Sequence, residues 1–179
     1  AAALLALSCG AILTGGLHED GLADTADGFG GGRTITRKLE IMRDSRIGSY
    51  GVLALILVIS TTAAAIETAG HIAAFVAIGA ASRTAMLVPM LLLTPARSDG
   101  LGHGATLDWG RSTGAALVLT GTIALLTQAV LPTLAMLITA LALSRLAQRQ
   151  IGGQTGDVLG ATQKVSECMG WLLITATAG

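Results

Sequence analysis

Four acidic side chains lie within nine residues near the start of the chain, in the segment HEDGLADTADGFGGG at residues 18–32. Asp20, Asp24 and Asp27 have the spacing i, i+4, i+7, which predicts that their carboxylates share one face of a helix. Carboxylates this close repel one another, and a bound divalent cation would relieve the repulsion. Mg²⁺ prefers oxygen ligands and takes one or two carboxylates together with water and substrate phosphate. The segment therefore predicts a catalytic Mg²⁺ site at these three residues, and the alternative is a solvated acidic helix end.

A second segment, MRDSRIGSYG at residues 42–51, carries side chains suited to phosphate. The guanidinium groups of Arg43 and Arg46 can each donate two parallel hydrogen bonds to phosphate oxygens, and Asp44 can orient one of them. The alternative is a cationic flank of a membrane span, because basic residues gather beside spans on the cytoplasmic side. Since the acidic segment is close by, we favour substrate binding for all three residues.

Two glycine-containing segments offer further candidate substrate-binding residues. The segment ARSDGLG places Arg97 and Asp99 in a predicted loop, although Asp-Gly is also common in ordinary turns. The segment GGQTGDVLGA places Thr155 and Asp157 before an apolar helix, whose N-terminal N–H groups could bind phosphate. Asp157 could instead cap that helix, and the sequence alone leaves both interpretations open.

One arginine, Arg83, lies about half-way along an apolar stretch at residues 72–93. A cation inside a membrane segment is costly and faces the bundle interior or a cavity. Arg83 therefore contacts a substrate diphosphate or forms an ion pair with one of the acids. His18, beside the acidic segment, is either a proton shuttle or an anchor at the membrane interface.

The composition indicates an integral membrane protein. Of the 179 residues, 52% are hydrophobic and only 12% are charged, whereas soluble domains average about 25% charged. The formal net charge of zero argues against a nucleic-acid partner. Cys9 and Cys168 lie in apolar stretches without metal-binding spacing, so we interpret both as small core residues.

A membrane helix needs about 20 apolar residues, with about 17 as the lower limit. The predicted spans are residues 1–17, 50–66, 72–93, 112–131, 133–146 and 166–179. The first, fifth and sixth of them are short. We therefore expect a single all-α domain over residues 1–179, a polytopic membrane helix bundle of about six spans.

Basic residues alternate between the predicted connections. Those at residues 18–48, 94–111 and 145–165 contain Lys or Arg, whereas residues 67–71 and the turn at Pro132 contain none. Because basic connections face the cytoplasm, we predict that all the motif-bearing connections lie on that face. The active site is therefore expected at the cytoplasmic side of the membrane.

The four segments quoted above, in this order, resemble the cobalamin synthase family, whose members are adenosylcobinamide-GDP ribazoletransferases. The resemblance runs from residue 15 to about residue 170. It implies adenosylcobinamide-GDP as the donor, α-ribazole or its 5′-phosphate as the acceptor, and release of GMP. It also implies a bacterial or archaeal cytoplasmic membrane, with lipid around the protein, and it allows a homo-oligomer. Because the chain begins at Ala1 inside an apolar stretch, we expect further membrane-spanning sequence before it.

The resemblance also implies roles for the candidate residues. Asp20, Asp24 and Asp27 would bind Mg²⁺, and one of them would serve as the general base. The diphosphate would be held by arginines, and the last cytoplasmic connection would complete the site. The implied residues outside the acidic segment are Arg43, Arg46, Arg97, Thr155 and Asp157.

Two other functions remain open at this point. The run DGLADTADG loosely resembles the acidic signature of CDP-alcohol phosphotransferases, but Ala23 is followed by Asp24 where that class has arginine. A transporter could use Arg83 and the carboxylates as an ion path. Most of the acids lie at the end of a span rather than near its middle, which disfavours transport.

Overall fold

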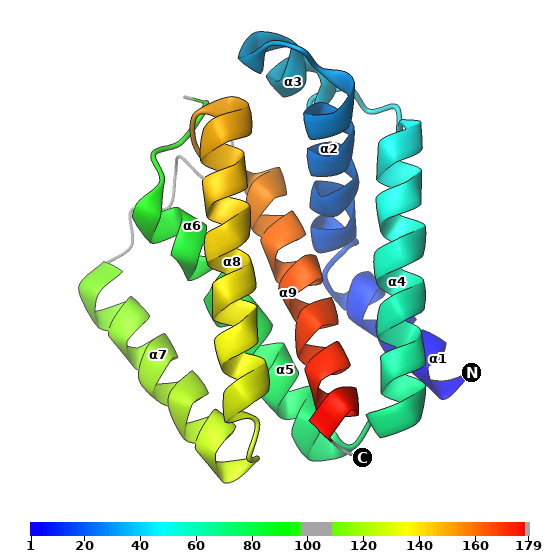
Figure 1. Cartoon of the computed structure of the whole chain (residues 1–179), viewed down its shortest axis with the longest axis vertical. Helices are drawn as coiled ribbons and strands as arrows, with labels where there is room; N and C mark the ends of the chain where they lie inside the picture. Colours follow the sequence, from blue (N-terminus) through cyan, green and yellow to red (C-terminus); the bar gives the residue numbers. More distant parts are fainter. Residues whose placement is uncertain (98–108, 178–179) are drawn as a thin grey trace.

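The structure, a computed structural model, describes residues 1–97 and 109–177, and their side chains except at 109–111. These residues form nine helices and an isolated bridge, which confirms the all-α prediction (Figure 1). The helices are α1 (Ala2–Leu13), α2 (Leu17–Gly31), α3 (Ile35–Ile41), α4 (Ser49–Ala69), α5 (Ile72–Ala85), α6 (Leu87–Leu92), α7 (Trp109–Leu126), α8 (Val130–Ile151) and α9 (Gly156–Thr177).

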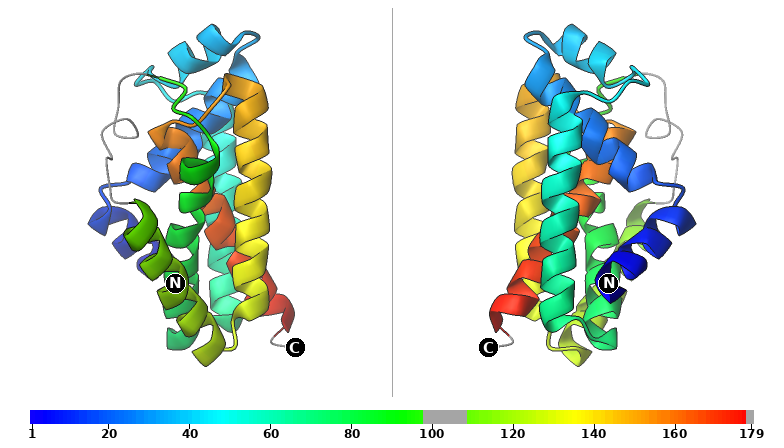
Figure 2. Two further views of the ribbon diagram at one scale, coloured as in Figure 1. Left: turned by 90° about the vertical axis from the view of Figure 1, so that its left-hand side faces the viewer. Right: turned by 90° about the vertical axis from the view of Figure 1, so that its right-hand side faces the viewer.

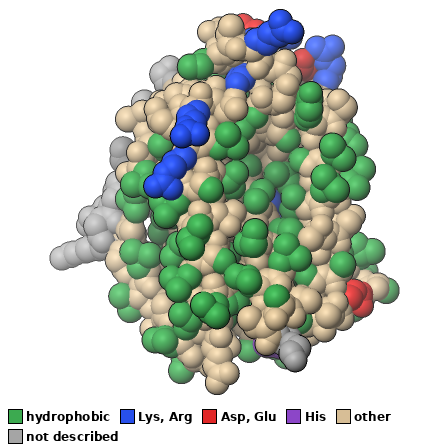
Figure 3. Space-filling model, viewed as in Figure 1, with side chains coloured by type: hydrophobic (Ala, Val, Ile, Leu, Met, Phe, Trp, Pro, Cys, Tyr) green, Lys and Arg blue, Asp and Glu red, His purple; other side chains and the backbone are tan. Residues whose placement is uncertain are grey.

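Three helical segments of the described chain are long and apolar enough to cross a membrane: Ser49–Ala69, Ile72–Leu92 and Val130–Ile151. Helices α1 and α2 pass the same test only as a pair, and they are bent by 91° relative to each other. Hydrophobic side chains cover much of the face in Figure 3, whereas Lys and Arg gather over its upper part. These features are those of a polytopic membrane helix bundle.

The break between α1 and α2 was not predicted. The sequence predicts one apolar span over residues 1–17, but α1 ends at Leu13. Gly15 and Gly16 follow with φ angles of +64° and +71°, values that glycine adopts without strain. The chain therefore turns sharply, and α2 runs obliquely across the bundle (Figure 2).

Two other boundaries differ from the prediction. Pro132 does not mark the turn between spans, because it lies in the first turn of α8, where a missing N–H costs nothing. Helix α9 begins at Gly156 rather than at Ser166, and the preceding connection shrinks to residues 152–155. The charged residues 157, 164 and 167 are therefore helical.

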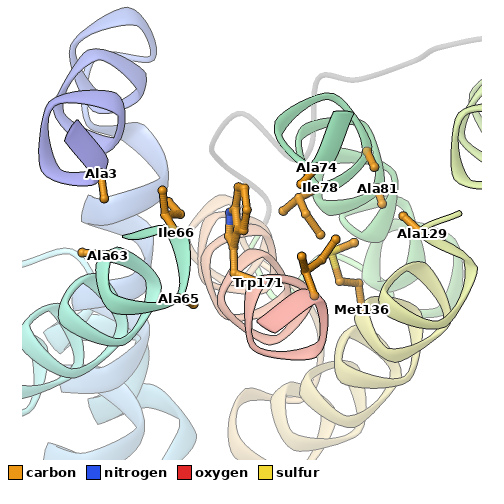
Figure 4. Close-up of a cluster of buried hydrophobic side chains, with 12 residues drawn as sticks. Ala3, Ala63, Ala65, Ile66, Ala74, Ile78, Ala81, Ala129, Met136 and Trp171 are labelled. Atoms are coloured by element: carbon orange, nitrogen blue, oxygen red, sulfur yellow. The ribbon is translucent and has the colours of Figure 1, made fainter. Parts of the chain in front are cut away.

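Helix α9 lies at the centre of the bundle and packs against α2, α4, α5 and α8 (Figure 1). Its Trp171 is 1% exposed and lies in a cluster with Ile66 of α4, Ile78 of α5 and Met136 of α8 (Figure 4). Phe75 contacts Trp171 edge to face, with 4.7 Å between the ring centroids. This apolar cluster holds the half of the bundle in which the chain ends.

The opposite end of the bundle collects the motif-bearing segments (Figures 1 and 2). Backbone hydrogen bonds join the segment after α6 to the connection before α9. The N–H of Ala96 donates to the Gln154 carbonyl at 2.8 Å, and the Gln154 N–H donates to the Thr94 carbonyl at 2.9 Å. Lys38 of α3 donates to Gln150 of α8. The described parts of the three basic connections therefore lie at one end of the bundle.

Candidate active site

The site is built where α2 crosses α9, and two glycines allow that crossing. A Cβ atom on Gly21 would lie 2.8 Å from the carbonyl oxygen of Asp157 and 3.2 Å from the Cα of Gly160. A Cβ atom on Gly160 would lie 3.2 Å from the Cα of His18. Because neither helix carries a side chain here, their backbones touch. The acidic segment of α2 is thereby brought against the first turns of α9.

The crossing gathers four carboxylates. Asp24 is half-buried, and its charge interacts with those of Asp20 and Asp27 on its own helix and with Asp157 on α9. Arg97 supplies the opposite charge to this group. The i, i+4, i+7 spacing thus predicted a real acidic cluster, and the fold adds a carboxylate and a guanidinium from distant segments.

Asp27 has a structural function that its spacing did not indicate. It is 7% exposed, and its Oδ2 and Oδ1 atoms accept hydrogen bonds from the N–H groups of Gly48 at 2.7 Å and Gly51 at 2.9 Å. These N–H groups belong to the start of α4, so the carboxylate serves as the helix cap. The side chains of Asp20 and Asp24 form no hydrogen bond or ion pair with any other described residue.

Arg97 and Asp157 form an ion pair, and both side chains are mostly buried, at 15% and 23% exposure. Thr155 Oγ1 donates to Asp157 Oδ2 at 3.3 Å and accepts from the Val158 N–H at 3.3 Å. Thr155 therefore caps α9, and Asp157 does not. The carboxylate of Asp157 instead fixes the guanidinium of Arg97 beside the acidic cluster.

The loop between α3 and α4 carries the other predicted phosphate ligands. Arg46 donates through Nε to Asp44 Oδ1 at 3.0 Å and through Nη2 to Asp44 Oδ2 at 2.6 Å. Asp44 thus contacts Arg46 as predicted, and phosphate binding by these residues stays a prediction. These hydrogen bonds lower the pKa of Asp44 to about 2. Arg46 and Arg43 are both exposed at the motif-bearing end of the bundle.

Arg83 does not join the acidic cluster. It donates through Nη1 to the Gly79 carbonyl at 2.9 Å and lines a cavity of about 180 Å³ together with His18 and Glu19. Asp99, the remaining predicted binding residue, lies outside the described residues. Of the candidates, the fold therefore groups Asp20, Asp24, Asp27, Arg97, Thr155 and Asp157.

Sequence reasoning missed a second polar cluster on the other side of the crossing. Lys164 of α9 is 7% exposed, and its Nζ lies 3.2 Å from Glu19 Oε1 and 2.7 Å from Glu167 Oε2. The sequence predicted that Lys164 lies in the connection at residues 145–165, and it gave Glu19 no separate role. The available signal was the i, i+3 spacing of Lys164 and Glu167, which typifies a helical ion pair.

A magnesium ion fits the acidic cluster only if water and substrate supply some of its ligands. Among the described residues, no three His, Cys, Asp or Glu side chains form a group that could hold a metal by themselves. Mg²⁺ does not require such a group, since one or two carboxylates with water and substrate phosphates suffice. The oxygen donors of Asp20 and Asp24, with more acidic than basic charge around them, suit this type of binding.

Comparisons with known proteins cover nearly the whole chain. A family model described as cobalamin-5-phosphate synthase matches residues 1–175. The chain is 49% identical to an adenosylcobinamide-GDP ribazoletransferase of Bradyrhizobium diazoefficiens over 99% of this chain and 70% of that protein. Proteins with the same name from Mesorhizobium japonicum and Shewanella pealeana are 46% and 39% identical, over 99% and 97% of this chain and 71% of each relative. No solved structure matches the chain.

Proposed function

Because this chain belongs to the cobalamin-5-phosphate synthase family, whose ribazoletransferase activity it shares, we propose that its reaction takes place at the α2–α9 crossing with Mg²⁺ as the cofactor. The enzyme joins adenosylcobinamide-GDP to α-ribazole or its 5′-phosphate. The observation that supports the location most strongly is the grouping of Asp20, Asp24 and Asp157 around Arg97. Arg97 and Asp157 come from segments that are far in the sequence from each other and from Asp20 and Asp24 of α2.

In the proposed reaction, a hydroxyl oxygen of the acceptor attacks the phosphorus on the cobinamide side of the diphosphate. A new P–O bond forms, and the P–O bond to GMP breaks. GMP leaves with the electron pair, and the hydroxyl proton passes to a carboxylate of α2. Such phosphoryl chemistry depends on positioning and charge neutralisation more than on covalent catalysis.

We assign the metal to Asp20 and Asp24, because the oxygens of Asp27 already cap α4. When bound there, Mg²⁺ supplies positive charge to the diphosphate and to the leaving GMP. Asp157 holds Arg97, whose remaining N–H groups are available for phosphate oxygens. Thr155 keeps Asp157 in place by its hydrogen bond.

The exposed loop between α3 and α4 is proposed as a second contact with the donor. Asp44 fixes one edge of the Arg46 guanidinium and leaves an N–H group for a ligand. We further propose that this end of the bundle faces the cytoplasm. The concentration of Lys and Arg at this end supports that orientation (Figure 3).

The test is turnover by the purified chain in lipid vesicles with adenosylcobinamide-GDP, α-ribazole and varied Mg²⁺, followed by release of GMP. We expect Asp24→Asn to abolish turnover while the protein still inserts into the membrane. Glu40→Gln is the matched control, because Glu40 is 56% exposed and pairs only with Arg37 among the described residues. Near-normal turnover by Asp24→Asn at limiting Mg²⁺ would show that the acidic cluster is not the metal site. Release of CMP when a CDP-alcohol is offered would instead support the phospholipid-synthase class.

A further inference from the structure

Two arginines on the outer surface of α8 have no role in the proposed reaction. Arg145 and Arg149 are exposed, and in the part of the chain that the structure describes neither side chain forms an ion pair or a hydrogen bond. Residues four positions apart are neighbours on a helix surface, so the two positive charges lie side by side and repel each other. Figure 3 shows Lys and Arg side chains together on the upper part of this surface, above hydrophobic ones. A bound anion would relieve the repulsion and accept hydrogen bonds from both guanidinium groups.

An apolar groove of about 310 Å³ lies between α7 and α8. Leu117 and Leu125 of α7 and Leu134 of α8 line it, and these side chains are 50%, 71% and 49% exposed. The groove is therefore open at the outer surface of the bundle. Because α8 is one of the helices long and apolar enough to cross a membrane, this surface faces lipid, and a hydrocarbon chain can enter the groove from there.

The lining of the groove suits hydrocarbon and makes no demand for a polar ligand. It consists mostly of Leu, Ala and Val side chains and includes no charged residue among those that the structure describes. The hydroxyl groups of Thr84 and Thr120 lie 2.6 Å apart and form a hydrogen bond with each other. The hydroxyl oxygen of Thr133 is buried and presents no polar surface to the groove. A cavity of about 150 Å³ admits a benzene molecule, so the groove has ample volume for part of an acyl chain.

The arginines and the groove lie on the same side of α8, at a separation that matches a membrane lipid. Leu134 and Arg145 are eleven residues apart, which is three helical turns to within about 20° and a rise of about 16 Å. One leaflet contributes about half of the hydrocarbon thickness of about 30 Å. Ile138, between the two positions, is 65% exposed, so the intervening surface is also apolar. A lipid with its phosphate at the arginines would thus place the end of an acyl chain at Leu134.

We propose that this surface of α8 binds an anionic phospholipid of the surrounding membrane. The lipid phosphate lies between Arg145 and Arg149, and one acyl chain follows α8 past Ile138 into the groove between α7 and α8. An anionic headgroup is preferred because a zwitterionic one carries its own cation, which competes with the arginines for the phosphate. Met136 and Ala140, which are fully buried, lie on the opposite side of α8, so this lipid site is separate from the reaction site and does not rest on the proposed function.

The first test measures lipid binding to the full chain in neutral detergent by native mass spectrometry. Phosphatidylglycerol is the anionic probe and phosphatidylcholine the zwitterionic one. We expect wild type to bind phosphatidylglycerol at least about tenfold more tightly than phosphatidylcholine, which corresponds to about 1.4 kcal/mol. The double variant with Arg145→Gln and Arg149→Gln should lose this preference. Equal affinity of the wild type for both lipids would overturn the proposal.

The matched control is the double variant with Arg33→Gln and Arg37→Gln. It removes two exposed arginines from the same end of the bundle, and Arg37 pairs only with Glu40 among the described residues. The control should keep the wild-type preference for phosphatidylglycerol. An equal loss in both double variants would show a general attraction of anionic lipid to this end of the protein, and it would refute a site at Arg145 and Arg149.

A second variant tests the groove. Gly121 lines it, and a Cβ atom added there meets nothing within 4 Å, so Gly121→Leu should fill the groove while the fold persists. We expect the affinity for phosphatidylglycerol to fall about tenfold. Gly10→Leu is the control, because Gly10 is helical and equally open but lies in α1, and it should bind lipid as the wild type does.

The remaining outcomes separate the lipid from other occupants. Glycerol 3-phosphate has the phosphate without acyl chains, and it should not displace phosphatidylglycerol at equal concentration. Displacement would show an anion site that does not use the groove, which would refute the lipid assignment. If Gly121→Leu instead reduced the fraction of dimer in the same spectra and left lipid binding unchanged, the groove would be an interface between two copies of the chain, and the proposal would be wrong.

Discussion

The contact between Gly21 and α9 gives a direct test of how the site is assembled. In Gly21→Ala, the new Cβ would lie 2.8 Å from the carbonyl oxygen of Asp157 and 3.2 Å from the Cα of Gly160. Both neighbours are backbone atoms, so no side chain can rotate away. Because ordinary contact begins at 3.4 Å, the two helices must separate by about 0.6 Å. The substitution therefore moves Asp24 away from Asp157 while keeping every functional side chain.

The expected effects follow from that displacement. Overpacking by a methyl group typically costs about 1–3 kcal/mol of stability. Misplacement of catalytic groups by about 1 Å can cost a hundredfold in rate, so about 0.6 Å should lower kcat roughly tenfold. We would measure kcat by GMP release well below the melting temperature of the variant, so that unfolding does not contribute.

The control is Gly156→Ala at the start of α9, where an added Cβ meets no atom within 4 Å. This variant makes the same chemical change in the helix that Gly21 contacts, and we expect wild-type kcat and melting temperature. If Gly21→Ala also gave wild-type kcat and melting temperature, the close approach of α2 and α9 would not assemble the site. Equal loss in both variants would indicate that replacing a glycine by alanine in either helix impairs the protein, whether or not the glycine lies at the contact.

The remaining predictions concern the helix cap, the donor loop and the orientation. Asp27→Ala should lower the free energy of unfolding by about 2 kcal/mol, because two N–H groups of α4 lose their acceptor, and Asp27→Asn should cost less; equal thermal stability of all three proteins would contradict the cap. Arg46→Lys should lose most of the donor affinity that Arg46→Ala loses, because lysine lacks the planar guanidinium that donates two parallel hydrogen bonds. Wild-type affinity in Arg46→Lys would indicate that Arg46 only orients the protein in the membrane by its positive charge. Since the pKa of Asp44 falls to about 2, its pair with Arg46 is present above that value and is lost as the pH falls through it, so the kinetics of Arg46→Lys relative to wild type should not change with pH in the neutral range. Cysteines at Thr36 and Gly156 should be labelled from the same side of sealed vesicles and one at His71 from the other, and labelling of Thr36 and Gly156 from opposite sides would contradict the common face.

The sequence predicted the acidic helix well because the relevant information is local. The spacing of Asp20, Asp24 and Asp27 determines which face they occupy once the segment is helical. The capping function of Asp27 could not be predicted in this way. It depends on the return of the chain through Gly48, which brings the start of α4 to one carboxylate and not to the other two.

The second polar cluster shows a different limit of sequence reasoning. Lys164 was counted among the basic residues of the predicted connection at residues 145–165, whereas a charged residue inside a membrane protein is costly. That cost is offset only in three dimensions, where Glu19 of α2 and Glu167 of α9 both contact the ammonium group. The i, i+3 partner could have been found from spacing, whereas Glu19 lies in another helix and needed the fold. Asp157 is similar, since its partner Arg97 lies in the segment that follows α6 and not in α9.

The distribution of charge along the two crossing helices differs between the two sides of the glycine contact. Above the glycine contact, the charge of Asp24 interacts with three other carboxylates and with only one guanidinium, so this region gains free energy from an added cation and its attached phosphates. Below the contact, Glu19 is neutralised by Lys164, and no such demand exists. The charged donor is therefore expected on the Asp24 side of Gly21. The glycine contact between α2 and α9 therefore separates an acidic environment, suited to a cation with phosphate, from one in which the buried charges are already paired.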